Sequence, residues 1–291
     1  MSARVSVAVV SWNTRDLLAR CLRSLEPDAR SGLAEVHVVD NGSTDGSATL
    51  VRDEFPWAGL IEPGENLGYG RAVNAVAERT STPWLAASNA DVALEAGSLE
   101  RLLAAGAGAR IGAVAPRLIL PDGSTQHSAY GFPTLPYLLA FNAGLYRVVP
   151  GLGDRLLIEG HWDPSRARDV PWAVGAFLLL RREAFDAAGG FDPQQWMYAE
   201  DVDLGWRLGR AGWRTRYEPS ARVHHAHGAA ARQAFGERPY RRWMEATYDW
   251  IERRRGRTRR VTAALLNVAG AVARRDRAWA RVHLRGLQRR A

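Results

Sequence analysis

The chain has 291 residues, enough for one large domain or two modest domains that each bury a core. Its single cysteine, Cys21, excludes an intrachain disulfide framework and a cysteine-rich zinc site, and it fits a reducing compartment. The N-terminus lacks a signal-peptide layout, and no run reaches the ~18 uncharged apolar residues of a membrane span. We therefore expect a cytoplasmic protein.

The formal net charge of +8 is unevenly distributed along the chain. Residues 229–291 contain 17 Arg against 5 acidic residues, a net charge of +12, which leaves −4 for residues 1–228. A mildly acidic body with a strongly basic tail indicates an anionic partner, such as a membrane surface, phosphates or nucleic acid.

The first ninety residues alternate between strand and helix patterns. Buried strands are expected at residues 5–10, 36–40, 60–61 and 84–88, because these runs are apolar and mostly β-branched. Helices are expected at residues 17–25, from about Asp45 with Ser43 or Thr44 as cap, and at residues 72–79. This alternation predicts a doubly wound α/β sheet.

Two of these strands end in carboxylates. Asp40 closes the second strand, and Asp91 follows Asn89 and Ala90 just past the fourth. For Asp91 alone, an Asx turn after a strand is a sufficient explanation. Core packing never requires carboxylates at strand ends, however, and open α/β sheets bind ligands at this edge. The pair of acids therefore predicts a ligand site.

The second half of the chain has weaker periodicity. We expect strands at 111–116, 174–180 and 215–223, and a β-hairpin at 117–126. Helices are expected at 99–105, through Phe185, from Glu200 and Asp201 onward, and within 237–291. Residues 128–170 are expected to form an irregular insertion with a short helix at 137–145. The acids at residues 200 and 201 can be explained as helix capping, since the helix dipole stabilises carboxylates at its N-terminus. His224 and His225 follow the last predicted strand.

Several short motifs occur in one order over roughly residues 5–228. They are Val9-Val10-Ser11-Trp12-Asn13, Val38-Val39-Asp40-Asn41-Gly42-Ser43, Asn66-Leu67-Gly68-Tyr69-Gly70-Arg71, Asn89-Ala90-Asp91, Gly190-Phe191-Asp192 and Glu200-Asp201-Val202-Asp203. With them the chain resembles a family 2 glycosyltransferase of the GT-A fold, close to the bacterial rhamnosyltransferase-like group. The resemblance implies a Rossmann-like mixed sheet flanked by helices over residues 1–228, with a donor half at about 1–116 and an acceptor half at about 117–228. Residues 229–291 would form an Arg-rich helical extension.

The resemblance also implies the donor side of the site. Asp40 would contact the nucleotide base, and Asn13 with neighbouring backbone would hold the ribose. The full set of implied donor-binding residues is Ser11, Asn13, Asp40, Asn41, Gly68, Arg71, Asn74, Asn89 and Ala90. Asp91 matches the last acid of the family's DxD metal motif, while Asn89 replaces the first acid. A single carboxylate suits Mg²⁺ or Mn²⁺ that takes other ligands from diphosphate and water. His225 is the favoured second ligand and His224 the alternative.

On the acceptor side, Asp201 matches the family's general base, with Glu200 beside it. A sugar hydroxyl is a poor nucleophile, so a carboxylate that takes its proton is needed. The resemblance implies inversion by direct displacement. Trp196 and Phe191 are the residues expected to stack on the acceptor.

We therefore expect an inverting transferase that moves a sugar, with L-rhamnose from dTDP-rhamnose favoured, onto a hydroxyl of a cell-envelope glycan or polyprenyl-linked saccharide. The alternatives are a UDP-hexose or UDP-galactofuranose donor, or a nucleotide-sugar-binding protein without turnover. A nucleic-acid binder would need a recognition motif that the sequence lacks. A nucleotidyltransferase would carry a Gly-rich basic loop where this chain has Ser11-Trp12-Asn13.

The basic tail has its own pattern. Arg253 to Arg260 precede the uncharged run Val261 to Ala273, which is typical of an interfacial helix on an anionic membrane. A solvated basic helix that packs on its own domain is the alternative. The sequence thus predicts peripheral binding to the inner face of the cell membrane through residues 229–291, and it leaves a homodimer open.

Overall fold

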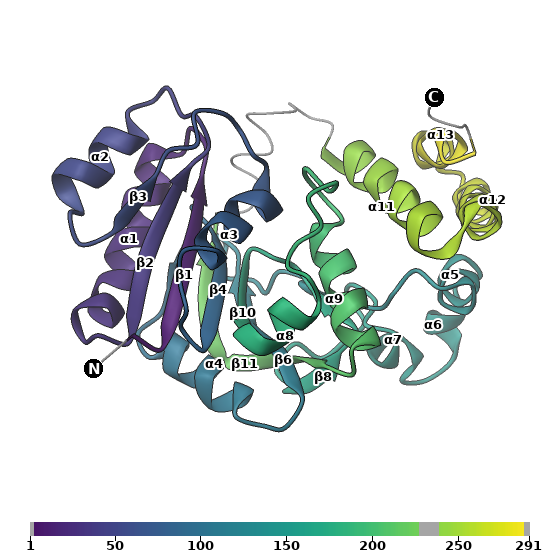
Figure 1. Cartoon of the computed structure of the whole chain (residues 1–291). Coiled ribbons are helices and arrows are strands. Elements are labelled where there is room, and N and C mark those ends of the chain that lie inside the picture. Colours follow the sequence, from purple (N-terminus) through teal and green to yellow (C-terminus); the bar gives the residue numbers. More distant parts are fainter. Residues whose placement is uncertain (1–2, 227–238, 288–291) are drawn as a thin grey trace. The chain divides into compact units, whose positions relative to one another are not determined.

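The structure, a computed structural model, describes residues 3–226 and 239–287 (Figure 1). It divides into two compact units. The sheet unit holds residues 3–129 and 164–226, and the helical unit holds residues 130–163 and 239–287. Residues 130–163 thus belong with the C-terminal helices, although the sequence placed them before the boundary at residue 228. The functional division at that boundary stays a prediction.

The sheet unit is built on one large sheet with the strand order β3-β2-β1-β4-β10-β6-β11-β5, to which β8 adds by pairing with β11. Its strands are β1 (Val5–Ser11), β2 (Ala34–Asp40), β3 (Gly59–Ile61), β4 (Trp84–Asn89), β5 (Val92–Leu94), β6 (Ile111–Ile119), β8 (Arg168–Val170), β10 (Phe177–Arg181) and β11 (Arg214–His225). The first four strands in this order run parallel, whereas β10 is antiparallel to both neighbours. A separate two-stranded sheet consists of β7 (Ala129–Tyr130) and β9 (Trp172–Ala173). The expected mixed α/β sheet is confirmed.

Helices cover both faces of the large sheet (Figure 1). They are α1 (Arg15–Arg30), α2 (Ser47–Glu54), α3 (Tyr69–Ala77), α4 (Ser98–Gly106), α8 (Arg182–Ala187) and α9 (Glu200–Arg210). Val5, Val7 and Val9 of β1 join the main core cluster with residues of α1, α2 and α4, because alternate residues of a strand point to one face. The intervening residue Ala8 is equally buried but lies outside that cluster. This two-sided burial explains why the strand is apolar throughout.

Two of three local expectations were wrong. Helix α2 is not capped by Ser43 or Thr44, because it begins at Ser47 and Asp45 Oδ1 accepts the Ser47 N–H at 3.0 Å. The expected 117–126 hairpin is present, because Ile119 forms an antiparallel bridge with Thr125 and Leu120 N donates to Ser124 O at 2.9 Å. His224 and His225 lie within β11 rather than after it, because β5 extends the pairing of β11 to its last residues.

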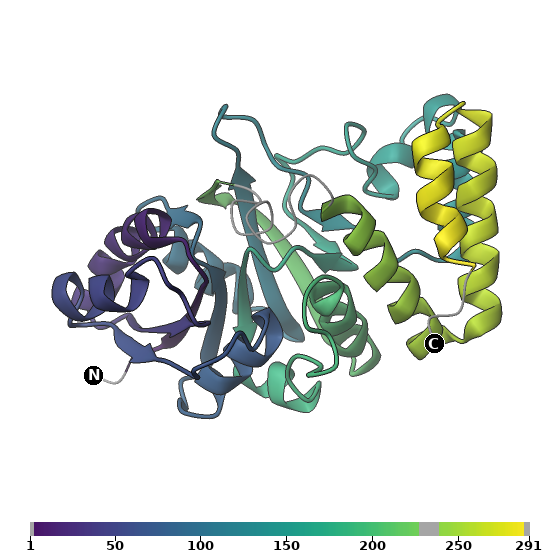
Figure 2. The ribbon, with the colours of Figure 1, turned by 90° about the horizontal axis from the view of Figure 1, so that it is seen from above.

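The helical unit contains α5 (Leu135–Asn142), α6 (Leu145–Val148), α7 (Leu152–Arg155), α11 (Pro239–Arg255), α12 (Arg257–Ala273) and α13 (Arg277–Arg285). Helix α12 packs against α5, α11 and α13, and Figure 2 shows α12 and α13 side by side. Ala263, Ala264 and Gly270 of α12 are buried at these contacts. Among the described residues, no helix is both long enough and apolar enough to cross a membrane.

A chain of polar side chains runs through the interior of the helical unit. Asn142 Nδ2 donates to Asn267 Oδ1 at 2.8 Å, and Asn267 Nδ2 donates to the Tyr248 hydroxyl at 3.0 Å. Since that hydroxyl already accepts one hydrogen bond, its own proton can be donated to His283 Nδ1 at 2.9 Å. The histidine accepting this bond is neutral. Burial, helped by the positive charge of Arg274, lowers the pKa of His283 to about 4.

We predict that His283 makes the stability of the helical unit depend on pH. Between about pH 4 and 6.5 the unfolded chain binds a proton at His283 that the folded chain does not bind. The stabilisation is therefore complete above pH 6.5 and is lost as the pH falls toward 4. His283→Gln should remove this dependence, which amounts to about 2–3 kcal/mol at the acid end.

Urea unfolding monitored by circular dichroism over this pH range measures the effect as the difference between wild type and variant. Exposed His161, in the same unit, provides the control, and His161→Gln should leave the pH profile unchanged. A difference between wild type and His283→Gln that does not vary with pH would contradict the prediction.

Candidate active site

The carboxyl edge of the parallel strands brings together residues that are far apart in sequence. Ser11 lies opposite Asp40 in the register of β1 with β2, and Val10 lies opposite Asn89 in the register of β1 with β4. The chain order reverses at β1, because β2 flanks it on one side and β4 on the other. A crevice at such a reversal is where open α/β sheets bind ligands.

Asp40 and Asn13 shape the loop on the β1–β2 side of this edge. Asp40 Oδ1 accepts the Ser43 N–H at 2.7 Å, and Asn13 Oδ1 accepts the Thr44 N–H at 2.7 Å. Asn13 also donates its own N–H to Ser43 Oγ at 2.9 Å from a left-handed backbone conformation, φ 50°. These bonds lock the 40–44 turn against the tip of β1. Contacts of Asp40 and Asn13 with a base and a ribose stay predictions.

The other expected donor residues differ in accessibility. Ser11 is fully buried, with its hydroxyl 3.1 Å from that of Thr14, and Ala90 is also buried, so both can face a ligand only through backbone. Asn41 is buried and donates to Gly68 O at 3.4 Å, whereas Asn89 is partly exposed and Arg71 is exposed.

A close contact joins the start of α3 to the segment before α9. A Cβ atom on Gly68 would lie 2.7 Å from Trp196 Cδ1 and even closer to Trp196 O, and one on Gly70 would lie 2.8 Å from Phe191 Cβ. Asn74 completes the contact, because its Nδ2 donates to Phe191 O at 2.8 Å and its Oδ1 accepts the Phe191 N–H at 2.9 Å. We call this contact, made by residues 66–74 and 190–196, the glycine seam.

The seam changes the roles of two expected site residues. Asn74 was expected on the donor side, but its amide bonds the backbone of Phe191. Phe191 was expected to stack on the acceptor, but its ring is fully buried against Tyr69 and Phe185, with both ring centroids 5.8 Å away. Trp196 is 42% exposed and donates its indole N–H to Asn66 O at 3.3 Å.

Glu200 and Asp201 begin helix α9 after two strained residues. Tyr198 and Ala199 have φ values of 64° and 62°, which is rare for non-glycine residues and occurs mainly where a site requires it. Asp201 Oδ1 accepts the Val202 N–H at 2.8 Å, and Oδ2 accepts the Gly175 N–H at 3.2 Å. The Asp201 carboxylate is therefore held between the start of α9 and the segment that leads into β10.

Tyr69 is a residue of this site that sequence reasoning missed. Its hydroxyl donates to Gly175 O, the same residue whose N–H holds Asp201. Burial raises the pKa of Tyr69 well above its usual value, and the charges of Glu200, Asp201 and Asp91 raise it further. Tyr69 and Asp201 are thus both held by the backbone of Gly175. The position of Tyr69 inside the Gly68–Arg71 motif was the only signal.

The pKa values of Glu200 and Asp201, the two acids at the start of α9, are raised for different reasons. Burial raises the pKa of Asp201, opposed by its backbone hydrogen bonds. Burial also raises the pKa of Glu200, and the neighbouring Asp201 charge raises it further. Asp201 therefore ionises first, and Glu200 keeps its proton to higher pH. This is the arrangement of one available base beside a neutral neighbour.

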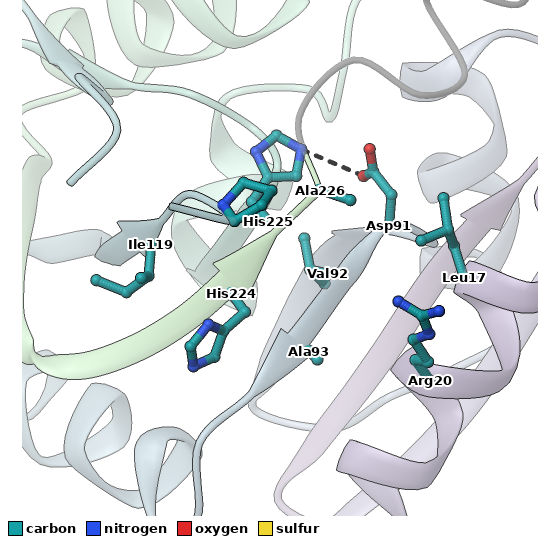
Figure 3. Close-up of a pocket in the computed structure, with 10 residues that line it drawn as sticks. Leu17, Arg20, Asp91, Val92, Ala93, Ile119, His224, His225 and Ala226 are labelled. Atoms are coloured by element: carbon teal, nitrogen blue, oxygen red, sulfur yellow. Dashed lines mark ion pairs between the residues drawn. The ribbon is translucent and has the colours of Figure 1, made fainter. Parts of the chain in front are cut away.

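Asp91 meets His225 at the end of β11 (Figure 3). His225 Nε2 lies 3.2 Å from Asp91 Oδ1, and His225 Nδ1 lies 2.7 Å from Gln126 Oε1. All three residues are buried. His224 points to the other side of the strand, where its ring is 54% exposed and 3.0 Å from Glu95. The structure thus brings His225, and not His224, to Asp91.

This pair fits a divalent cation. An imidazole nitrogen and a carboxylate oxygen form a mixed donor set that suits Mn²⁺, and a carboxylate alone suits Mg²⁺. Within residues 3–226 and 239–287, no cluster of three or more His, Cys, Asp or Glu side chains gathers as a complete metal site. Among the described residues, Asp91 and His225 would supply two ligands. Both residues line a pocket of about 220 Å³ with Leu17, Arg20 and Ile119 (Figure 3).

Comparison with known families covers most of the chain. Residues 6–147 match the family model described as glycosyl transferase family 2, and residues 160–246 match the one described as glycosyltransferase-like family 2. Two solved structures share the fold at low sequence identity. One is GalNAc-T7 with UDP, GalNAc and Mn²⁺, with a TM-score of 0.58 and 17% identity over 77% of this chain and 44% of that one. The other is the mannosyltransferase PcManGT from Pyrobaculum calidifontis with GDP-Man and Mn²⁺, with a TM-score of 0.56 and 20% identity over 99% and 86%.

Two curated relatives are informative. The N-acetylglucosaminyl-diphospho-decaprenol L-rhamnosyltransferase of Mycobacterium tuberculosis is 37% identical over 77% of this chain and 76% of its own length. The rhamnosyltransferase WbbL of Escherichia coli is 36% identical over a shorter stretch, 30% of this chain and 32% of its own length. The expected GT-A fold and glycosyltransferase activity are confirmed. The chain belongs to glycosyltransferase family 2.

Proposed function

We propose that this glycosyltransferase moves L-rhamnose from dTDP-rhamnose to a hydroxyl of a polyprenyl-diphosphate-linked saccharide, with inversion at the transferred carbon. The observation that carries the proposal is the 37% identity, over 77% of this chain, to a relative named as an L-rhamnosyltransferase acting on a diphospho-decaprenol sugar. The Asp201 carboxylate, held in place by the Val202 and Gly175 N–H groups, supports turnover rather than binding alone.

The donor would bind at the carboxyl edge of β1, β2 and β4. The 40–44 turn, fixed by Asp40 and Asn13, would form the nucleotide side, and Arg71 and Asn89 would lie toward the diphosphate. Asp91 and His225 would hold Mg²⁺ or Mn²⁺, which when bound neutralises charge on a leaving nucleoside diphosphate. The Mn²⁺ in both similar solved structures supports a divalent ion here.

Asp201 would act as the general base. Its two backbone hydrogen bonds fix the carboxylate, and its raised pKa makes it a better proton acceptor than an ordinary aspartate while it is still ionised near neutral pH. It would take the acceptor hydroxyl proton as the oxygen attacks the anomeric carbon and the bond to the diphosphate breaks. Neutral Glu200 adds no second charge, and Trp196 would provide the platform for the acceptor sugar.

A UDP-hexose or UDP-galactofuranose donor would use the same residues in the same roles. Turnover of a panel of nucleotide sugars distinguishes these donors.

The first prediction concerns the donor and the base. Purified protein with Mn²⁺ should release nucleoside diphosphate from dTDP-rhamnose in preference to UDP- and GDP-sugars, and Asp201→Asn should lower this rate by about 10²–10⁴-fold, the usual contribution of a general base. Exposed Asp53 on α2 gives a matched control, Asp53→Asn, which should keep the wild-type rate.

The outcomes separate donor from mechanism. Preference for a UDP-sugar would overturn the rhamnose donor and keep the mechanism. An unchanged rate in Asp201→Asn would overturn the assignment of the base. Failure to bind any nucleotide sugar would overturn the proposal as a whole.

The second prediction is the pH profile. Because burial raises the pKa of Asp201, kcat should fall on the acid side at a pH above the ordinary aspartate value of about 3.9. Glu200→Gln keeps the burial and removes only the neighbour that ionises later, so the acid limb should stay in place. Loss of the acid limb in Glu200→Gln, measured with saturating donor and acceptor, would instead identify Glu200 as the base.

A lipid-linked acceptor requires the enzyme to work at a membrane, and helix α12 offers a surface for this. One face of α12 is buried against the other helices of the helical unit. On its outer face Leu265 and Val272 are 53% and 62% exposed. Residues 261–273 carry no charge over about 20 Å of helix, while exposed arginines flank them on both sides, at 257 and 259 and again at 274, 275 and 277. A solvated helix face is normally polar, so this pattern favours anionic lipid headgroups with shallow insertion.

The third prediction tests this surface. The full chain should sediment with phosphatidylglycerol-containing vesicles and not with phosphatidylcholine vesicles. Replacing both Leu265 and Val272 by Asp should lower the bound fraction at least about tenfold, because each change removes an apolar contact and adds repulsion. The matched control adds the same charges to the sheet unit, through Ser81→Asp and Ala104→Asp.

Two results would contradict the membrane assignment. One is vesicle binding that the α12 variant leaves unchanged. The other is a dimer in sedimentation velocity that only the α12 variant dissociates, which would assign the face to a second copy of the chain.

A further inference from the structure

We infer that Gln126 is a positioning residue that keeps the proton of His225 on Nδ1 and so directs the Nε2 lone pair toward the cation position beside Asp91. The inference rests on the proposed function, in which Asp91 and His225 hold a divalent ion. It assigns a role to the 117–126 hairpin, which that function leaves without one.

The geometry begins with a short buried contact. His225 Nδ1 lies 2.7 Å from Gln126 Oε1, and both side chains are buried. An amide oxygen only accepts hydrogen bonds, so a contact at this distance requires a hydrogen on Nδ1. The form of imidazole that binds a metal is neutral and carries one N–H, so with that hydrogen on Nδ1 the Nε2 atom presents its lone pair.

The lone pair is directed at the proposed metal position. Nε2 is the ring atom that lies 3.2 Å from Asp91 Oδ1 (Figure 3). An imidazole that protonates Nε2 instead would turn an N–H toward the carboxylate and could not bind a cation through that atom. A hydrogen-bond acceptor on the far nitrogen of a ligating histidine selects the competent tautomer and fixes the ring.

The hairpin holds Gln126 at this place. Gln126 N donates to Leu118 O at 2.9 Å, next to the bridge between Ile119 and Thr125. At the turn, Asp122 Oδ1 accepts the Ser124 N–H at 2.9 Å and the Ser124 hydroxyl at 2.6 Å. The end of β6 forms the first arm of the hairpin and pairs with β11 up to His224. The second arm, which holds Gln126, therefore reaches the last residue of β11. The hairpin thus presents one amide to His225.

Two substitutions separate an acceptor role from mere packing. Gln126→Leu fills similar space without an acceptor. Gln126→Glu retains an acceptor that cannot donate, so it preserves the Nδ1–H tautomer. Thr125→Val is the control for the hairpin itself, because it removes the 2.7 Å bond from Arg117 to Thr125 without altering the amide at His225.

The experiment measures Mn²⁺ binding in the presence of dTDP, from the electron paramagnetic resonance signal of free Mn²⁺. We expect Gln126→Leu to weaken binding about 10–100-fold, the usual effect of removing the partner of a metal-ligating histidine. Gln126→Glu should bind within a few-fold of wild type, and Thr125→Val should match wild type. Melting temperatures in EDTA verify that all variants are folded.

A second readout reports the tautomer directly. Nitrogen-15 spectra of the His225 ring, assigned with His225→Ala, should show Nδ1–H in wild type and Gln126→Glu with Mg²⁺ and dTDP, and a mixture in Gln126→Leu. Wild-type Mn²⁺ affinity in Gln126→Leu, or an Nε2–H ring in the wild-type Mg²⁺ complex, would overturn the inference. If His225→Ala itself binds Mn²⁺ as well as wild type, the metal assignment of the proposed function fails instead.

Discussion

The glycine seam is the contact on which the rest of the site depends. A side chain at Gly68 or Gly70 would collide with Trp196 or Phe191, so the start of α3 must present bare backbone to these two residues. The paired hydrogen bonds between Asn74 and Phe191 fix this approach from the other side. Behind it, fully buried Asp203 binds Arg207 Nε at 2.7 Å, and Arg207 Nη1 holds the carbonyl oxygen of Gly190 at 2.6 Å. The glycine seam thus supports both the loop before α3 and the acids Glu200 and Asp201 at the start of α9.

The seam also creates the electrostatic problem that the site has to solve. It brings Glu200 and Asp201 into a position where burial raises the pKa of both carboxyls and the Asp201 charge raises that of Glu200 further. The N-terminus of α9 and the Gly175 N–H offset part of this cost for Asp201. For Glu200, burial and the neighbouring Asp201 charge outweigh its one backbone hydrogen bond, so Glu200 keeps its proton to higher pH. The chemical difference between the two adjacent carboxylates therefore follows from the larger number of backbone hydrogen bonds at Asp201, which include those from Val202 and Gly175.

Sequence patterns predicted what depends on local periodicity. The strands of the first ninety residues, their polar tips and the helix at Glu200 follow from burial on a pleated sheet and from helix capping. Sequence patterns could not predict contacts between segments that are far apart in the chain. Nothing local distinguishes Phe191 as buried, Tyr69 as a partner of Gly175, or Asn142 and Asn267 as one hydrogen-bonded chain, because each role requires a partner more than 100 residues away. The roles expected for individual residues in binding the donor and the metal came from the resemblance to a family and not from local patterns.

The choice between His224 and His225 shows how such a contact is decided. Neighbouring strand residues point to opposite faces, so a slip of one residue in β11 would exchange the two rings. The register of β11 against β6 shifts between Glu218 and Arg222, which realigns the rest of the strand. After that shift His225 lies opposite Val92 of β5, one residue beyond Asp91, and the Ala226 N–H donates to Asp91 O at 2.9 Å. The irregularity in β11 thus places His225 against Asp91 and Gln126, while His224 points to the opposite face and contacts Glu95.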